Sequence, residues 1–535
     1  MLEPLVVVLM TVLVIGALCR RLGLVEPPVL LLAGLAIGFI PRFRDIELPP
    51  ELILTIVLPA LLYWEALTTS LREVRANLRV IVLLAVGLVL FTTPVVAAAL
   101  HEFNGCDWPT AFIIGAVLAP TDAAAVAAIA FLLPRRFMTM LRAESLINDG
   151  TALVLFAAAV DVAVSGKRVH WGNIWLDLVL SYSGGIAVGA LVAGLIILIR
   201  RHLDDPMLGT VLSVATPFMA FLAADEIDVS GVLAVVVCGL TVARYAPRYI
   251  SAESRTRTYS FWGLTSYLLN ASLFVLVGIE LPQVADALQS HTLREGIAAV
   301  LVATLTILLA RVVWSFMSVG VIRTFDRRPS QRARRVALRQ RVPNLWAGVR
   351  GGISLAAALA VPYTTKTGAP FVERDFIIFV AGGTVLLTLV IQGSTLPRVI
   401  RWAHYAPDEA VGREHDLARH AIIDAALEHL ERVTHETPHQ EKVVRSLKMS
   451  LEKQHMTLPD PEVDGTSAAA RGFLDFETEV RLELVEVQRD TLTKLRNEGQ
   501  IDGAIYLRLE SVLDSDEKNL RLTRDARSGD LRGPE

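Results

Sequence analysis

Long apolar segments recur along most of this chain and constrain its fold more than any other feature. The chain has 535 residues, of which 53% are hydrophobic and 20% are charged. Apolar runs of roughly 17–25 residues are what membrane-spanning helices require. We expect such runs at about residues 3–19, 24–41, 50–68, 80–100, 109–133, 138–164, 174–199, 207–224, 229–246, 261–281, 294–322, 343–363 and 374–398. The pattern predicts an all-α polytopic membrane protein with about thirteen transmembrane helices.

Arginine residues alternate between the loops and indicate how the chain is oriented in the lipid bilayer. Every second loop carries them, beginning with Arg20 and Arg21, and the densest run lies at residues 326–341. The intervening loops, such as HEFNGCDWP and AADEIDVSG, are poor in Arg and Lys. Because positively charged loops stay in the cytoplasm, we expect an inner-membrane protein with its N-terminus outside and its C-terminus inside. The run at 326–341 then anchors the topology, and we expect no nucleic-acid partner.

The character of the chain changes after the last apolar run. Residues 1–405 form the predicted transmembrane domain, and from about Pro407 the sequence becomes rich in charged, helix-forming residues. Apolar residues recur there at helical spacing. We therefore interpret residues 406–535 as a helical cytoplasmic tail and take a regulatory role as the hypothesis for it.

An odd number of spans suggests an inverted repeat around a connecting helix. If the seventh span is the connector, the fifth span, at 109–133, corresponds to the twelfth, at 343–363. Both are interrupted, the fifth by Pro120 and the twelfth by the sequence Arg350-Gly351-Gly352. A matched pair of broken helices is typical of a transporter's binding site, so we expect the two breaks to cross near the membrane midplane.

Polar residues interrupt the apolar segments between Ala119 and Gly150. They are Thr121, Asp122, Glu144, Ser145, Asn148 and Asp149. Carboxylates in hydrocarbon are costly and usually functional. The other interpretation, charges at helix ends that reach the headgroups, is disfavoured because apolar residues flank each of them. The pairs Glu144/Asn148 and Ser145/Asp149 each share a helix face, and Asp149 lies roughly 18 Å into a ~30 Å core. Carboxylate, hydroxyl and freed carbonyl oxygens suit a small hard cation.

Arg350 is the main cation expected within the membrane, and an unpaired arginine there is costly. Glu144 is the first choice for its partner and Asp122 the second, which leaves Asp149 free to hold either a proton or a metal cation. Glu65, toward the inner end of the third span, either lines the cytoplasmic entrance or contacts the ion through water, and a charge reaching the headgroups is an equal alternative. We expect Arg311 to bind helix-end carbonyls and Asn270 to join helices.

Four motifs resemble the sodium/proton exchanger branch of the monovalent cation–proton antiporters, in particular its bacterial members. They are PTDAAAV, ESLINDGTALVLF, LFVLVGIEL and GVRGGISLAAALAVP, and the resemblance covers about residues 5–400. It implies that Asp149 binds Na+ and H+, with Ser145, Thr121 and, through water, Glu65 completing the coordination. It also implies that Asn148 and Asp122 support the crossing segments and that Glu144 pairs with Arg350. The family is homodimeric, moves a core domain like an elevator, and is typically electroneutral when Asn precedes Asp.

Exchange of Na+, or alternatively Li+ or K+, for H+ by alternating access is therefore the leading hypothesis. A K+/H+ antiporter is the nearest alternative, since the expected ligands do not separate the two ions. A cation channel would need rings of charges or carbonyls, and an intramembrane enzyme would need a catalytic pair that the spans lack. There is no P-loop for ATP, and three scattered cysteines, Cys19, Cys106 and Cys238, do not suggest a metal cluster. We expect no cofactor and no enzymatic activity.

Overall fold

The computed structural model of the chain is almost entirely helical wherever it is described. It describes residues 2–43, 49–69, 71–122, 133, 135–165, 171–203, 205–246, 249–288, 291–325, 338–366, 368–405, 409–433, 437–456, 468–498 and 503–527. Within these residues, the extended structure is limited to an isolated bridge between Thr364 and Pro370. The chain divides into two compact units, Met1–Ala406 and Pro407–Glu535. The expected all-α architecture is confirmed.

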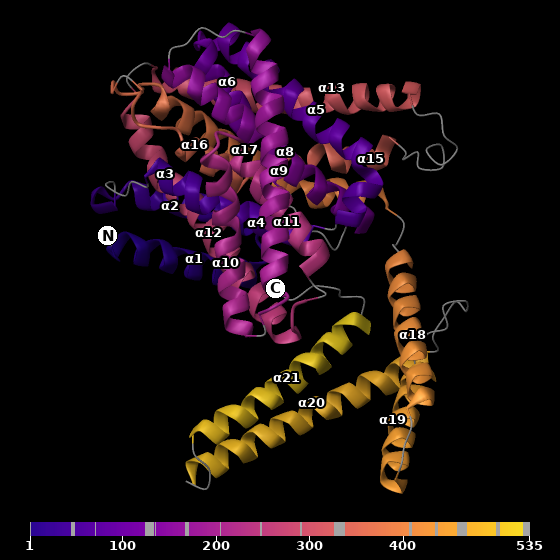
Figure 1. The fold of residues 1–535 in the computed structure, drawn as a ribbon. Helices are drawn as coiled ribbons and strands as arrows, with labels where there is room; N and C mark the ends of the chain where they lie inside the picture. Colours follow the sequence, from indigo (N-terminus) through magenta and orange to yellow (C-terminus); the bar gives the residue numbers. More distant parts are fainter. Residues whose placement is uncertain are drawn as a thin grey trace. The chain divides into compact units, whose positions relative to one another are not determined.

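The first unit is a bundle of long and short helices (Figure 1). Its elements are α1 (Leu2–Leu22), α2 (Glu26–Gly38), η1 (Pro41–Phe43), α3 (Pro50–Leu52), η2 (Ile53–Val57), α4 (Leu58–Thr68), α5 (Leu71–Asn104), α6 (Trp108–Leu118), α8 (Arg135–Ser165), α9 (Trp171–Arg200), α10 (Pro206–Asp225), α11 (Gly231–Tyr245), α12 (Ala252–Asp286), α13 (Leu293–Phe325), α15 (Leu338–Trp346), α16 (Gly352–Leu359) and α17 (Arg374–Ala403). The short helices α6, α15 and α16 fall in the two segments expected to be broken.

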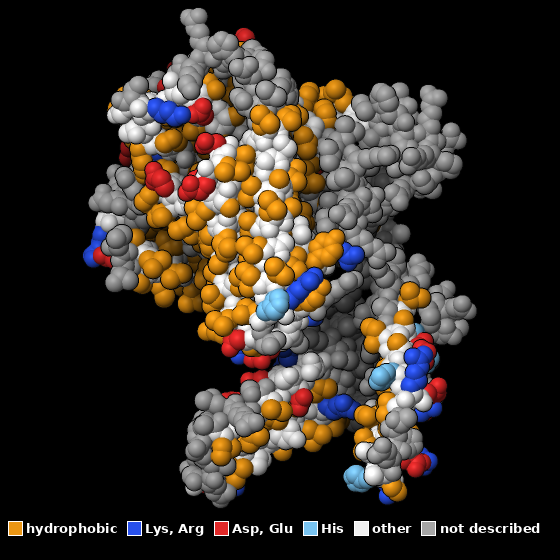
Figure 2. Space-filling model, in the orientation of Figure 1, with side chains coloured by type: hydrophobic (Ala, Val, Ile, Leu, Met, Phe, Trp, Pro, Cys, Tyr) orange, Lys and Arg blue, Asp and Glu red, His pale blue; other side chains and the backbone are white. Residues whose placement is uncertain are grey.

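The long helices of this unit have the length and composition of membrane spans. Among the described residues, nine helices are long and apolar enough to cross a bilayer, and three shorter apolar helices, Glu26–Gly38, Trp108–Leu118 and Gly231–Tyr245, accompany them. Apolar side chains also cover much of the outer surface (Figure 2), and Leu191 of α9, for example, is 74% exposed. In water such a surface would be unfavourable, whereas lipid chains match it. The count of thirteen spans stays a prediction.

Helices α2 and α12 approach one another unusually closely. A Cβ atom added at Gly34 would lie 2.2 Å from the carbonyl oxygen of Val275, and one added at Gly278 would lie 2.3 Å from that of Leu31. Gly38 makes a third close approach, since its added Cβ would lie 2.5 Å from the Ile279 oxygen. Small residues at four-residue spacing let membrane helices pack backbone against backbone. The glycines therefore fix the distance between these two helices.

We expect a Gly34→Ala substitution to destabilise the membrane unit, because the two backbones must separate to admit the methyl group. Overpacking of this kind typically costs about 1–3 kcal/mol, which would lower the melting temperature of the purified protein. Gly194→Ala on α9 is the matched control, because no heavy atom lies within 4 Å of its added Cβ. If both variants melted at the wild-type temperature, the close packing of α2 on α12 would be contradicted.

The described residues of the second unit form four helices, in agreement with the helical tail expected from the sequence. They are α18 (Glu409–Arg432), α19 (Pro438–Met456), α20 (Ala468–Asn497) and α21 (Gly503–Arg527). Helices α20 and α21 lie side by side in Figure 1. Arg489 of α20 joins them, since its Nη2 lies 2.7 Å from Asp514 Oδ1 and 2.8 Å from Glu517 Oε2. Hydrogen bonds from Arg489 and from Arg521 lower the pKa of Glu517. The expected loop at 457–467 lies outside the described residues.

Candidate functional site: the crossing of two broken helices

The first break follows α6, whose ends are set by its sequence. Asp107 caps the N-terminus, where its Oδ2 accepts a hydrogen bond of 3.3 Å from the backbone N–H of Thr110. The helix ends at Leu118, and Pro120, which has no N–H to donate, follows in a non-helical stretch that reaches Asp122. The break at Pro120 is thus unwound on this side and is more than a kink. The other half of the fifth expected span, from residue 123 onward, is largely outside the described residues.

The second break separates α15 from α16 and meets the first directly. The backbone N–H of Asp122 donates to the carbonyl oxygen of Val349 at 2.8 Å. The N–H of Gly352 donates to Asp122 Oδ2 at 3.4 Å. Gly351 must be a glycine at this contact, because an added Cβ would lie 1.6 Å from Asp122 Oδ2. The crossing of broken helices predicted from the sequence is therefore present.

Charged side chains compensate the helix ends at this crossing, where backbone groups lack helical hydrogen-bond partners. Arg350 is 1% exposed, and its Nε donates to the carbonyl oxygen of Leu118 at 2.8 Å, at the C-terminus of α6. A further bond joins Arg350 Nη1 to the Gly348 carbonyl. The carboxylate of Asp122 lies at the N-terminus of α16. A cation at a helix C-terminus and an anion at a helix N-terminus are each favourable, because the helix dipole has the opposite sign there.

The polar face of α8 lies against the first break. Ser145 Oγ donates to the carbonyl oxygen of Thr121 at 2.7 Å, and Asn148 Nδ2 donates to Thr121 Oγ1 at 3.1 Å. Asn148 is fully buried and Asp149 is 2% exposed. Within the described part of the chain, Asn148 Oδ1 has no hydrogen-bond partner. One turn of α8 therefore presents a hydroxyl, an amide oxygen and a carboxylate beside the unwound backbone.

Glu65 of α4 reaches the same place. The carboxyl groups of Asp149 and Glu65 lie within hydrogen-bonding reach of one another, and both reach the Ser145 side chain. Asp122 is close enough to act on both electrostatically. Two carboxylates this close in a buried site repel one another unless a cation or a proton lies between them. Glu65 is half-buried and lies beside the same group of polar side chains.

The partner of Glu144 differs from the one expected. Glu144 Oε1 pairs with Nη2 of Arg311, on α13, at 3.0 Å, and both side chains are buried. Arg311 also donates to the Asn344 carbonyl oxygen from Nε at 3.3 Å and from Nη2 at 3.1 Å. The predicted Glu144–Arg350 pair is corrected accordingly: Arg350 is occupied by the carbonyl groups that the breaks leave without helical partners.

Asn270 of α12 also lies at this crossing, where it joins α12 to the start of α16, in agreement with the helix-joining role expected for it. An added Cβ on Gly352 would lie 1.8 Å from Asn270 Oδ1, so the amide sits directly against the start of α16. Its position just before the LFVLVGIEL segment was visible, but its neighbour is more than eighty residues away in the sequence. The only available signal was an amide within an apolar run. Glu280, near the end of α12, pairs with Arg374 at 3.3 Å.

The fold and the crossing define a membrane protein of the class that binds its cargo at discontinuous helices. The family described as "Sodium/hydrogen exchanger, transmembrane" matches residues 8–402. An uncharacterised Na+/H+ exchanger of Mycobacterium tuberculosis is 40% identical over 524 residues, which are 97% of this chain and 96% of the relative. The chain therefore belongs to the sodium/hydrogen exchanger family.

More distant relatives agree with this assignment. A sodium, potassium, lithium and rubidium/H+ antiporter of Bacillus subtilis is 32% identical over 408 residues, covering 73% of this chain and 60% of the relative. A solved structure of the sodium proton antiporter MjNhaP1 from Methanocaldococcus jannaschii superimposes with a TM-score of 0.59 at 21% identity, covering 74% of this chain and 99% of that one. The likeness to that structure supports the fold, and the family membership rests on the sequence matches.

Proposed function

We propose that this chain exchanges Na+ for H+ across a bacterial inner membrane by alternating access, with Asp149 as the group that binds the two ions in turn. Na+ is bound by Asp149 together with oxygens from Ser145 and Thr121, and Glu65 contributes directly or through water. In the protonated state the same carboxyl group carries H+ and has no need of the cation. The two ions then compete for one buried site, and that competition couples their opposite movements.

The convergence of Asp149, Glu65 and Ser145 beside the unwound end of α6 is the observation that carries this proposal. Ser145 lies within reach of both carboxyl groups and contacts the Thr121 carbonyl, so charged and neutral oxygens converge on one buried place. Oxygen ligands of this kind suit a small monovalent or divalent cation. The ion site is held in position by side chains that bind the two breaks and the helices around them. These side chains are Asp122, Asn148, Glu144 and Arg350.

Electroneutral exchange follows from the charges of the two loaded states. Asn148 stands beside Asp149, and its amide is bound to Thr121. Only Asp149 then changes its occupant, from one Na+ to one H+, and the loaded site carries the same charge in both states. We further propose, from the family resemblance and the arginine pattern, a homodimer with its N-termini outside and its C-termini in the cytoplasm.

Proteoliposomes that contain the purified protein and an internal pH dye provide the test of this function. We expect added Na+ to dissipate an imposed pH gradient at the same rate with the membrane potential clamped at zero or left free. Li+ and K+ are added in turn, because the Bacillus subtilis relative is named for several ions. A response to K+ alone would make the chain a K+/H+ antiporter. A current without proton movement would indicate a channel, and a rate that follows the membrane potential would contradict electroneutrality.

A further inference from the structure

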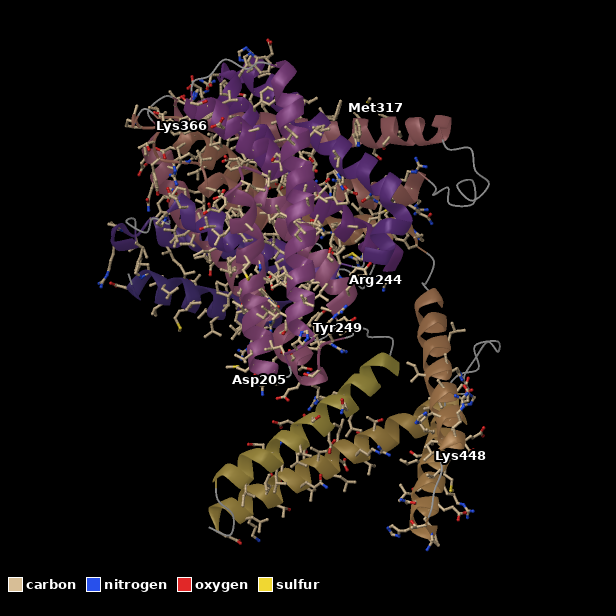
Figure 3. All side chains as sticks on the ribbon, viewed as in Figure 1. Asp205, Arg244, Tyr249, Met317, Lys366 and Lys448 are labelled. Atoms are coloured by element: carbon tan, nitrogen blue, oxygen red, sulfur yellow. The ribbon has the colours of Figure 1, made fainter. Side chains whose placement is uncertain are left out.

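A second polar site lies where α9 ends and where α10 and α12 begin. A small pocket that opens to the surface is lined there by polar residues from all three segments, Arg200, Asp205, Tyr249, Ser251 and Ser254. Figure 3 labels Asp205 and Tyr249, which lie close together at this end of the bundle. The pocket contacts none of the groups that form the crossing of the broken helices. Its own chemistry therefore needs a separate explanation.

Arg200 is the central feature of this pocket. The residue is only 4% exposed, and within the described part of the chain its buried Nε has no hydrogen-bond partner. A buried guanidinium with an unused donor is costly and is usually matched to an anion. Guanidinium groups bind phosphate and carboxylate oxygens with a fixed fork of donors. The unused donor thus points to an anionic ligand.

The start of α12 adds donors of the same kind. Ser251 caps this helix of 35 residues, and its hydroxyl oxygen accepts a hydrogen bond of 3.2 Å from the Ser254 N–H. The first N–H groups of a helix have no helical acceptors and attract phosphate groups. Ser254 is 5% exposed and also lines the pocket. The helix N-terminus and the buried arginine therefore face the same small volume.

The charged groups around the pocket suit an anionic ligand. Arg201 donates to the Tyr249 hydroxyl at 3.1 Å and lies 4.6 Å from the centre of the Tyr249 ring. Asp205 is the one carboxylate among the described lining residues. Its Oδ1 accepts from the N–H groups of Met207 at 2.7 Å and Leu208 at 2.9 Å, so its charge compensates the start of α10.

The surroundings favour the membrane as the source of such an anion. The candidate spans Val179–Arg200, Pro206–Asp225 and Glu253–Ala287 all end or begin at the pocket. Next to it on α10, Met207 is 62% exposed, Leu208 54% and Val211 56%. A phosphate held in the pocket would leave acyl chains lying along these apolar side chains. Basic pockets between spans on the arginine-rich side of a membrane suit anionic headgroups.

We propose that this pocket binds the phosphate group of an anionic phospholipid, with Arg200 and the N-terminus of α12 as its donors. Phosphatidylglycerol then stabilises the membrane unit by tying together the ends of three helices. Phosphatidylcholine carries the same phosphate but adds a choline cation, which the neighbouring arginines repel. Inorganic phosphate shares the anion's chemistry and lacks the acyl chains, so it separates a lipid ligand from a soluble one.

Thermal unfolding of the full-length protein in neutral detergent tests the proposal. We expect phosphatidylglycerol to raise the melting temperature of the wild type by a few degrees and phosphatidylcholine to leave it unchanged. The shift should vanish in Arg200→Gln, shrink in Arg200→Lys, and persist in Arg257→Gln, which removes an exposed arginine paired with Glu253 at 2.6 Å. A shift given by inorganic phosphate alone would support the phosphate site but assign it a soluble ligand.

The proposal is overturned if Arg200→Gln keeps the wild-type shift, or if no ligand shifts the wild type. Gly209→Ala covers the case in which Arg200→Gln does not fold. The added Cβ lies 2.7 Å from Ser254 Oγ, at the end of a side chain that can rotate, and it narrows the pocket without removing a charge. We expect this variant to melt near the wild-type temperature and to lose most of the phosphatidylglycerol shift. A full shift in a folded Gly209→Ala protein would equally contradict the site.

Discussion

Asp149→Asn should reduce Na+-dependent exchange to the rate of protein-free liposomes while the protein stays folded. Asparagine fills the same volume, so the contacts of α8 with the break at Thr121 are preserved. It cannot release a proton or supply a negative charge to Na+. The transport of H+ and the transport of Na+ are therefore lost together. Removing one of the neighbouring carboxylates also relieves repulsion in a buried site. We therefore expect a melting temperature equal to or above that of the wild type.

Asp161→Asn is the matched control for this substitution. Asp161 is on the same helix, but its carboxylate is largely exposed and pairs with Lys366 at 2.5 Å. Exposed ion pairs contribute about 0–1 kcal/mol, so both folding and exchange should survive. The initial rate of Na+-driven dissipation of a pH gradient measures both variants. Exchange retained by Asp149→Asn at a substantial fraction of the wild-type rate would refute the role of Asp149 as the shared carrier.

Removing either partner of the buried Glu144–Arg311 pair should destabilise the membrane unit severely. Breaking one side of a buried pair leaves the other charge uncompensated and costs about 3–5 kcal/mol. Arg311→Gln leaves the Glu144 carboxylate without its ion-pair partner and also removes the bonds to the Asn344 carbonyl. Glu144→Gln removes the ion-pair partner of the Arg311 guanidinium, which then keeps its bonds to the Asn344 carbonyl. We expect both variants to melt far below the wild type and to be recovered in low yield.

A double-mutant cycle distinguishes the Glu144–Arg311 pair from the Glu144–Arg350 pair that the sequence predicted. The double variant Glu144→Gln/Arg311→Gln should be less destabilised than the sum of its single variants, because no buried charge is left without a partner. The same cycle with Arg350→Gln should show a smaller coupling to Glu144, since Arg350 binds the carbonyl groups of Leu118 and Gly348. Equal or larger coupling between Glu144 and Arg350 would contradict the pairing in this structure.

The sequence predicts the architecture well because each of its signals is local. The length of the apolar runs predicts an all-α membrane protein, and Pro120 marks a place where the helix must lose a hydrogen bond. The four-residue spacing on α8 places Ser145 and Asp149 on one face. That the breaks cross follows from the pairing of the fifth and twelfth spans, which uses only topology.

Contacts between distant segments could not be predicted in the same way. Arg311 and Arg350 both lie in apolar runs, and no spacing rule decides which of them faces Glu144. The choice depends on where the breaks expose carbonyl groups, which is a tertiary property. Glu65 and Asn270 illustrate the same limit, because their roles depend on helices that are adjacent only after folding. The positions of polar residues are thus readable from the sequence, whereas their partners are not.

The pH dependence of the apparent KM for Na+ tests the central claim, that Na+ and H+ compete for one buried carboxyl group. Initial rates are measured in proteoliposomes over a series of Na+ concentrations at each pH, with the same pH on both sides at the start. If one proton excludes one Na+, the KM should rise by about tenfold for each pH unit below the point where protons begin to compete, with the maximal rate unchanged, because linked binding equilibria are reciprocal. A KM independent of pH, with only the maximal rate responding, would contradict a shared site at Asp149.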